Sequence, residues 1–248
     1  MAKVALMVLA LIVAALSQGG APQPVQQSVP ERDKDVAAAK AAFEKRLSEV
    51  DAKMALVVDL RAAFEQRKTT ALLKKPLVSK GTLVCKGESV LWKTTSPRES
   101  DMLVGPEKVT VSYPADKLAE EYPIGARFRD AAGGPLPRLS KLKERFTITE
   151  LDEAALKELS MSGDAMKGRL GLLLSPKDDE LKKHVASVRV ILDVGVPCAD
   201  RVVIADPEGD ETEIRFSEAK INTGVKDSDL ELKLAPGTKV SRPLERGK

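Results

Sequence analysis

Few residues of this chain have the types and spacing that catalysis requires. The single histidine, His184, lies in the charged stretch LKKHV, and no Gly-x-Ser-x-Gly segment places a serine nucleophile. A catalytic triad needs a nucleophile held against an oriented base, so we interpret His184 as a surface residue. Carboxylates are plentiful, and spacing alone leaves a paired-carboxylate hydrolase open. The pattern as a whole predicts a protein that is not an enzyme.

Motifs for metals and cofactors are equally scarce. One histidine and two distant cysteines do not have the spacing of zinc ligands. The acidic run from Asp200 to Glu211 does not have the glycine position and the ligand spacing of a calcium loop, and we interpret it as a solvated hairpin turn. The glycine pairs at 19–20 and 133–134 do not open helices after strands, so no phosphate-binding loop is implied. We predict no cofactor and no metal.

The overall composition argues against nucleic acid as a partner. The 248 residues include 40 basic and 37 acidic side chains, with a formal charge of +3. Such a balance gives no strong field for binding a phosphate backbone. Aromatic residues make up only 3% of the chain, so base-stacking platforms are not expected either.

The N-terminus has the pattern of a secretory signal peptide. Lys3 precedes an unbroken apolar run from Val4 to Leu16, and small residues follow it. The run is shorter than the roughly 20 residues of a membrane-spanning helix. We therefore predict a signal peptide over 1–21, a flexible Pro- and Gln-rich leader over 22–32, and one exported domain over 33–248.

The two cysteines, Cys85 and Cys198, have two interpretations. An oxidising compartment permits a disulfide between them. Free cysteine also packs as a small hydrophobic residue, and we favour two separate buried thiols over the bridge.

One amphipathic helix is expected at the start of the domain. After Asp33, the apolar residues Val36, Phe43, Leu47 and Val50 recur at helical spacing with charged residues between them. This periodicity predicts a helix of about four turns.

The next stretch, from Val58 to Glu65, has good helix formers but also strict alternation. Leu60, Ala62 and Phe64 stand at every second position. Such alternation is typical of a half-buried strand, and we favour the strand.

Strand patterns dominate the rest of the chain. Short helices are expected at 115–122, after the N-cap candidate Asp152, and in PKDDELKKHV. MSGDAMKG is expected to be a loop. Alternating or continuous apolar segments, bounded by Gly and Pro, predict further strands at 77–86, 89–96, 101–105, 108–113, 146–149, 170–174, 188–194, 201–205, 211–216 and 230–234.

These elements predict an α+β protein that is mainly antiparallel β. We expect about nine to eleven strands, one N-terminal helix and two or three short central helices. A sheet of this size must curl, close or be covered, because an open apolar face is not stable in water.

The order of several short motifs resembles the LolA family of periplasmic carriers of outer-membrane lipoproteins. Those motifs are FEQRK (64–68), KPLVSKGTLVC (75–85), VLWKTTSP (90–97), DMLV (101–104), VTVSYP (109–114) and the Pro-Gly-Thr-x-Val ending at 236–240. The match spans roughly 45 to 240 and is weakest between 115 and 168. Lys86-Gly87-Glu88 stands where well-studied carriers have Lys-Arg-Pro, so no role of that arginine is transferred.

The resemblance implies an unclosed, half-open β-barrel whose helices form a lid over an apolar cavity. It implies a periplasmic carrier that shelters the acyl chains of lipoproteins, or of another lipid, and transfers them toward the outer membrane. The implied partners are an inner-membrane lipoprotein-releasing transporter and an outer-membrane acceptor. The alternative is a regulatory or sensor module on the same fold, which reads lipoproteins or a partner protein.

Side-chain alternation selects the residues that would line such a cavity. For each of them, ordinary core between sheet and helices is the alternative. They are Leu60, Phe64, Leu83, Val90, Trp92, Val109, Val111, Val190, Leu192, Ile214 and Phe216.

Overall fold

The computed structural model describes residues 32–123 and 138–243. The predicted signal peptide and, apart from Arg32, the predicted leader lie outside the described residues. No described helix is both long enough and apolar enough to cross a bilayer.

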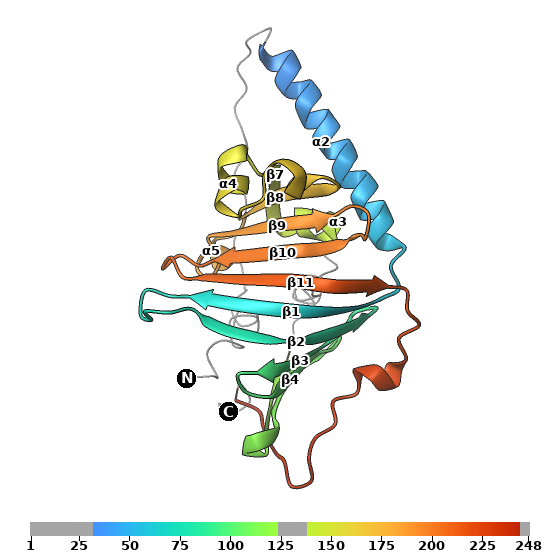
Figure 1. Ribbon diagram of the computed structural model, residues 1–248, viewed down its shortest axis with the longest axis vertical. Helices are drawn as coiled ribbons and strands as arrows, with labels where there is room; N and C mark the ends of the chain where they lie inside the picture. Colours follow the sequence, from blue (N-terminus) through green and yellow to red (C-terminus); the bar gives the residue numbers. More distant parts are fainter. Residues whose placement is uncertain (1–31, 124–137, 244–248) are drawn as a thin grey trace.

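The N-terminal helix, α2, runs from Arg32 to Ala55 and is longer than the pattern predicted. Leu47, Val50 and Met54 are buried at spacings of three and four residues, so they share one face of the helix. Phe43 packs beside them while remaining partly exposed. The helix therefore has a narrow apolar stripe for contact with the rest of the protein. Figure 1 shows α2 as the long helix that precedes β1.

Twelve strands form a single sheet in the order β12-β6-β5-β4-β3-β2-β1-β11-β10-β9-β8-β7. Most neighbours pair antiparallel, and Figure 1 shows the strands from β7 to β4 stacked in this order. The strands are β1 (Asp59–Thr69), β2 (Leu77–Lys86), β3 (Ser89–Ser96), β4 (Ser100–Val104), β5 (Lys108–Tyr113), β6 (Leu118–Pro123), β7 (Phe146–Glu150), β8 (Arg169–Pro176), β9 (Ser187–Asp193), β10 (Cys198–Ala205), β11 (Glu211–Ile221) and β12 (Lys239–Ser241).

The sheet is not closed, because β7 and β12 are the end strands of the order and do not pair with each other. The predicted class, a mainly antiparallel, unclosed sheet with few helices, is confirmed. The ambiguous stretch near Phe64 is a strand, as favoured, and pairs on both sides with β2 and β11.

Two predicted elements are wrong. The helix expected at 115–122 is a 3-10 turn, η1 (Pro114–Asp116), followed by β6, because pairing with β5 supplies the backbone hydrogen bonds that a helix would have made. The strand expected at 230–234 is not formed: Leu230 ends the 3-10 helix η3 (Asp227–Leu230), and residues 231–234 belong to no helix or strand. Instead β12 pairs in parallel with β6, and the strand count rises to twelve.

One face of the sheet, called the inner face here, carries the main apolar cluster. It is covered by α2 and by two short helices, α3 (Leu139–Arg145) and α5 (Asp179–Lys182). Leu139 of α3, Leu181 of α5 and the nearby Val185 belong to the same buried cluster as the strands.

The opposite, outer face is covered by two other segments. The helix α4 (Glu153–Glu158) and the 3-10 helix η2 (Gly163–Met166) pack against Leu173, Ile191 and Val203, which alternate with the inner-face residues. The predicted helix after Asp152 is therefore present, and Asp152 caps it by accepting a bond from the Ala155 N–H at 2.8 Å. All central helices were expected to belong to a lid over the inner face, and for α4 this is wrong. Its apolar residues pack against strand residues that point to the outer face.

The chain after β11 covers another part of the outer face, over β2, β3 and β4. This segment, residues 222–232, is called the strap here; it carries η3 and is drawn in red in Figure 1. Its Val225 and Leu230 are buried against Leu91, with Val84 and Leu103 packed beside them.

Candidate functional site

The eleven residues predicted to line a cavity all lie on the inner face. Each has at most 6% of its surface exposed, and all belong to one apolar cluster. They come from β1, β2, β3, β5, β9 and β11, so strands distant in sequence contribute to one surface. The sequence missed other members of the cluster, from β4 and β8. They are Met102, Val104, Leu170, Leu172 and Leu174.

Strand register brings the aromatic residues of this face together. Phe64 of β1 is opposite Phe216 of β11, and Leu83 of β2 is opposite Trp92 of β3. The Phe64 and Trp92 rings meet edge to face with their centroids 4.9 Å apart. The ring centroids of Trp92 and Phe216 are 5.9 Å apart. Such pairs add stability beyond area burial.

Gly81 of β2 has no side chain, and the Phe64 ring occupies part of the space that a side chain there would need. A Cβ at Gly81 would lie 2.9 Å from Cε1 of Phe64 and 1.9 Å from the carbonyl oxygen of Lys93. The glycine of the Ser-x-Gly-x-Leu motif is therefore required by packing on the inner face.

Trp92 has an unsatisfied polar atom at the centre of the aromatic cluster. Among the described residues, its Nε1 is the single buried side-chain nitrogen or oxygen without a hydrogen-bond partner. An unpaired buried donor costs about 1–3 kcal/mol.

One end of the inner face is polar, which the sequence analysis missed. Gln66 and Lys68 follow Phe64 at alternate positions of β1, and both are buried. Thr94, Ser100 and Thr212 are buried inner-face residues of β3, β4 and β11 at the same end. The alternation of the FEQRK motif was the available signal, because it places Phe64, Gln66 and Lys68 on one face.

Polar contacts hold α3 beside α2 over the inner face. The backbone N–H of Leu139, at the start of α3, donates to Oδ1 of Asp51 at 2.8 Å. The residue at the N-cap of α3, Arg138, makes no side-chain capping bond. Asp51 of α2 therefore does the capping for α3 from outside the helix.

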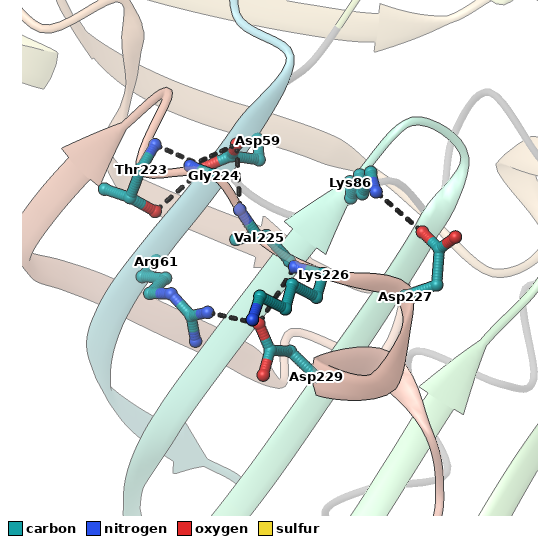
Figure 2. A network of polar contacts seen from close by, with 9 residues as sticks. All are labelled: Asp59, Arg61, Lys86, Thr223, Gly224, Val225, Lys226, Asp227 and Asp229. Atoms are coloured by element: carbon teal, nitrogen blue, oxygen red, sulfur yellow. Dashed lines mark hydrogen bonds and ion pairs between the residues drawn. The ribbon is translucent and has the colours of Figure 1, made fainter.

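A buried carboxylate fixes the strap to the start of β1. Asp59 accepts hydrogen bonds from Thr223 N (2.7 Å), Thr223 Oγ1 (2.9 Å), Gly224 N (3.0 Å) and Val225 N (3.2 Å), as Figure 2 shows. Burial by itself would raise the pKa of Asp59, but these hydrogen bonds outweigh it and the pKa is lowered.

Ion pairs extend this attachment along the strap. Arg61 pairs with Asp229 at 2.6 Å, and Lys86 pairs with Asp227 at 2.6 Å (Figure 2). The Lys86-Gly87-Glu88 turn thus uses its lysine to hold the strap against β2.

Both cysteines are buried and free in the structure. Burial raises the pKa of the Cys85 thiol above its usual range and raises that of Cys198 to about 12. A thiol with a raised pKa is a poor nucleophile. This supports the interpretation of both residues as packing groups rather than reactive ones.

The outer face has a charged pocket of about 260 Å³, which is stabilised by ion pairs within it. Arg189 pairs with Glu158 at 3.2 Å and Glu211 at 2.5 Å. Glu213 pairs with Arg215 at 2.8 Å and with Arg201 at 3.4 Å. These arginines hold α4 and neighbouring strands together.

His184 is exposed, as expected for a surface residue. Within residues 32–123 and 138–243, no three His, Cys, Asp or Glu side chains gather in a way that could hold a metal ion.

No protein-family model matches the chain, and no curated protein matches it either. Similar solved structures do exist. An uncharacterized conserved protein from Thermus thermophilus has a TM-score of 0.50 at 10% identity, over 81% of this chain and 99% of that one.

Two further structures are similar at lower scores. A LolA superfamily protein from Nitrosomonas europaea has a TM-score of 0.40 at 11% identity, over 76% of this chain and 97% of that one. The MucA/MucB complex of Pseudomonas aeruginosa includes a chain with a TM-score of 0.42 at 14% identity, over 77% of this chain and 60% of that one. At 10% identity, the likeness to the Thermus thermophilus protein concerns the fold alone.

Proposed function

We propose that this protein is an exported carrier that binds acyl chains against the inner face of its sheet. The cargo is an acylated lipoprotein or another lipid, which the carrier transfers through the periplasm toward the outer membrane. An inner-membrane transporter is the proposed donor, and an outer-membrane protein is the proposed acceptor. The protein does this by binding and release, without chemical turnover.

The observation that carries the proposal is the composition of the inner face. A single apolar cluster spans strands from β1 to β11, and helices rather than a second sheet cover it. Burying a methylene group contributes about 0.8 kcal/mol. A chain of several methylenes therefore gains enough to stay bound in water without a covalent bond.

Loading requires the helices to separate from the sheet. Leu47, Leu139 and Leu181 of α2, α3 and α5 occupy the space over the strands in the structure. An acyl chain would replace their contacts with similar aliphatic contacts, so the exchange is close to balanced and release remains possible.

The test is binding of a fluorescent fatty-acyl probe to the delipidated protein. We expect stoichiometric, saturable uptake, together with a change in the emission of Trp92, which is the only tryptophan of the chain. No uptake across several lipid classes would contradict the proposal.

A matched pair of variants locates the binding face. Val190→Thr places a hydroxyl on the inner face, and Val203→Thr places one on the outer face; both valines are buried, at 4% and 3% exposure. Both variants should lose similar folding stability, while only Val190→Thr should weaken probe binding, by roughly 5- to 10-fold.

Crosslinking in the native periplasm distinguishes the carrier from the regulatory module. Adducts with acylated cargo and with transporter components support the carrier. Adducts with a regulatory protein alone, at normal levels of free lipoprotein, would favour the sensor function instead.

A further inference from the structure

The inner face changes from apolar to polar along β1. Leu60, Ala62 and Phe64 are followed at the same alternation by Gln66 and Lys68, all of them buried. Across the sheet, the residue opposite Lys68 on β11 is Thr212, which is also buried. The face is therefore amphipathic along the strand direction, with an apolar part near α2 and a polar part near the β1–β2 hairpin.

Lys68 is the charged group of the polar part. Its side chain is only 9% exposed, and its ammonium lies 3.8 Å from a carboxylate oxygen of Asp210, beyond hydrogen-bonding distance. An ammonium group has three donors, so an anionic group of a ligand can pair with Lys68 beside Asp210.

Within residues 32–123 and 138–243, the buried side chains that share this end of the inner face with Lys68 are uncharged. The buried polar residues at this end, namely Gln66, Thr94, Ser100 and Thr212, are neutral. Asp210 is partly exposed at the β10–β11 turn, and its backbone N–H donates to Asp206. The β1–β2 and β10–β11 hairpins lie at the same end of the strands in Figure 1. The 3.8 Å distance places Asp210 of the β10–β11 turn beside Lys68.

We propose that Lys68 binds the anionic headgroup of an acyl-chain ligand, a carboxylate or a phosphate, and so fixes the direction in which the chain lies. This inference rests on the proposed function, because it concerns a ligand bound at the same inner face. The headgroup pairs with the ammonium at the polar end, and the chain extends along β1 toward Phe64, Trp92 and Phe216. The inner face has a charged group at one end and apolar residues along the rest of β1. An amphiphile with an anionic headgroup and an acyl chain has the same arrangement.

The strand register determines which part of a bound acyl chain lies near Trp92. Trp92 is in the row of Leu83 and Ala62, and Ala62 is six positions before Lys68 on β1. At about 3.3 Å per residue, the two rows are about 20 Å apart. The distal half of a long acyl chain, rather than its first carbons, should therefore lie near the indole.

The first experiment compares headgroups on one chain length. Dissociation constants for palmitate, palmitoyl lysophosphatidic acid and hexadecanol are measured with the delipidated protein. We expect each anionic ligand to bind at least about 10-fold more tightly than hexadecanol. A preference for palmitate over the phosphate lipid identifies a carboxylate source, and the reverse identifies a phospholipid source.

Variants assign the preference to Lys68. Lys68→Met should remove the preference for anionic ligands while hexadecanol binding is retained. Asp210→Asn should strengthen the binding of anionic ligands, because it removes a competing carboxylate. Lys93→Met, which changes an exposed lysine of β3, should leave both affinities unchanged. An anionic preference that persists in Lys68→Met would overturn the inference.

The second experiment uses the wild-type protein alone, so it does not depend on the folding of a variant. Fatty acids with bromine at different chain positions quench tryptophan fluorescence on contact. We expect the strongest quenching of Trp92 from bromines in the distal half of the chain, and the opposite order overturns the inference.

The two proposals fail in different ways. If neutral and anionic chains bind equally well, the headgroup site is wrong and the carrier function stands. If no acyl ligand binds at all, the carrier function is wrong as well.

Discussion

At the scale of single residues, the short motifs of the chain mark positions where backbone and side-chain packing meet. Gly81 is required because Phe64 and the Lys93 carbonyl occupy the space of a side chain. Phe64, Gln66 and Lys68 share a face because they alternate on one strand. These motifs are visible in the sequence, but the packing that requires each residue depends on which strand lies beside it.

We predict that Gly81→Ala destabilises the protein by roughly 1–3 kcal/mol, because the added Cβ must displace Phe64 and backbone of β3. Urea unfolding, followed by circular dichroism, measures the change. The control is Gly105→Ala, where the nearest atom to an added Cβ is 3.5 Å away and the loss should be about 0.5 kcal/mol or less. Equal losses at the two glycines would show that packing at Phe64 is not the cause.

At the scale of elements, the two faces of the sheet are covered in different ways. The inner face is covered by α2, α3 and α5, while α4 and the strap cover the outer face. The amphipathic pattern of each short helix could be read from the sequence. The sequence does not predict which face of the sheet each helix covers, because an apolar side chain packs equally well against either side of an apolar strand.

The contact between α2 and α3 leads to a prediction about loading. Asp51→Ala removes the bond that caps α3, which costs about 1 kcal/mol. If α3 must leave the inner face before a chain enters, the rate of acyl-probe uptake should rise about 5-fold, as measured by stopped-flow fluorescence.

Glu49→Ala, at an exposed position of the same helix, is the control for this experiment and should not change the rate. An unchanged rate for Asp51→Ala would mean that α3 does not gate the inner face.

At the scale of the whole molecule, the strap connects the middle of the sheet to its edge. It leaves β11 and crosses the outer faces of β2 to β4, and the chain after it continues to β12, which pairs with β6. Asp59 anchors its first residues with four hydrogen bonds, so one buried carboxylate helps to hold a segment that covers three strands.

This anchor should make stability depend on pH in the acidic range. The pKa of Asp59 is lowered in the folded protein, so its contribution is complete above the unfolded-state pKa, about 3.9, and is lost as the pH falls through the folded-state pKa. Asp59→Asn should cost about 1–3 kcal/mol at pH 7, and the difference from wild type should shrink below about pH 4. Urea unfolding at several pH values measures it, and a difference that is constant down to pH 2 would contradict the assignment.

The sequence by itself determined most of the strands, the open antiparallel class and the residues of the inner apolar surface, because alternation with period two records which side of a strand is buried. It did not determine the strand β6, since ADKLAEEY has helix-forming residues and becomes a strand only through pairing with β5. The parallel pairing of β12 and the site of the strap also depended on partners more than a hundred residues away. Only the tertiary structure placed Lys68 beside Thr212 and Asp210, because that contact depends on the register of two strands that no local pattern encodes.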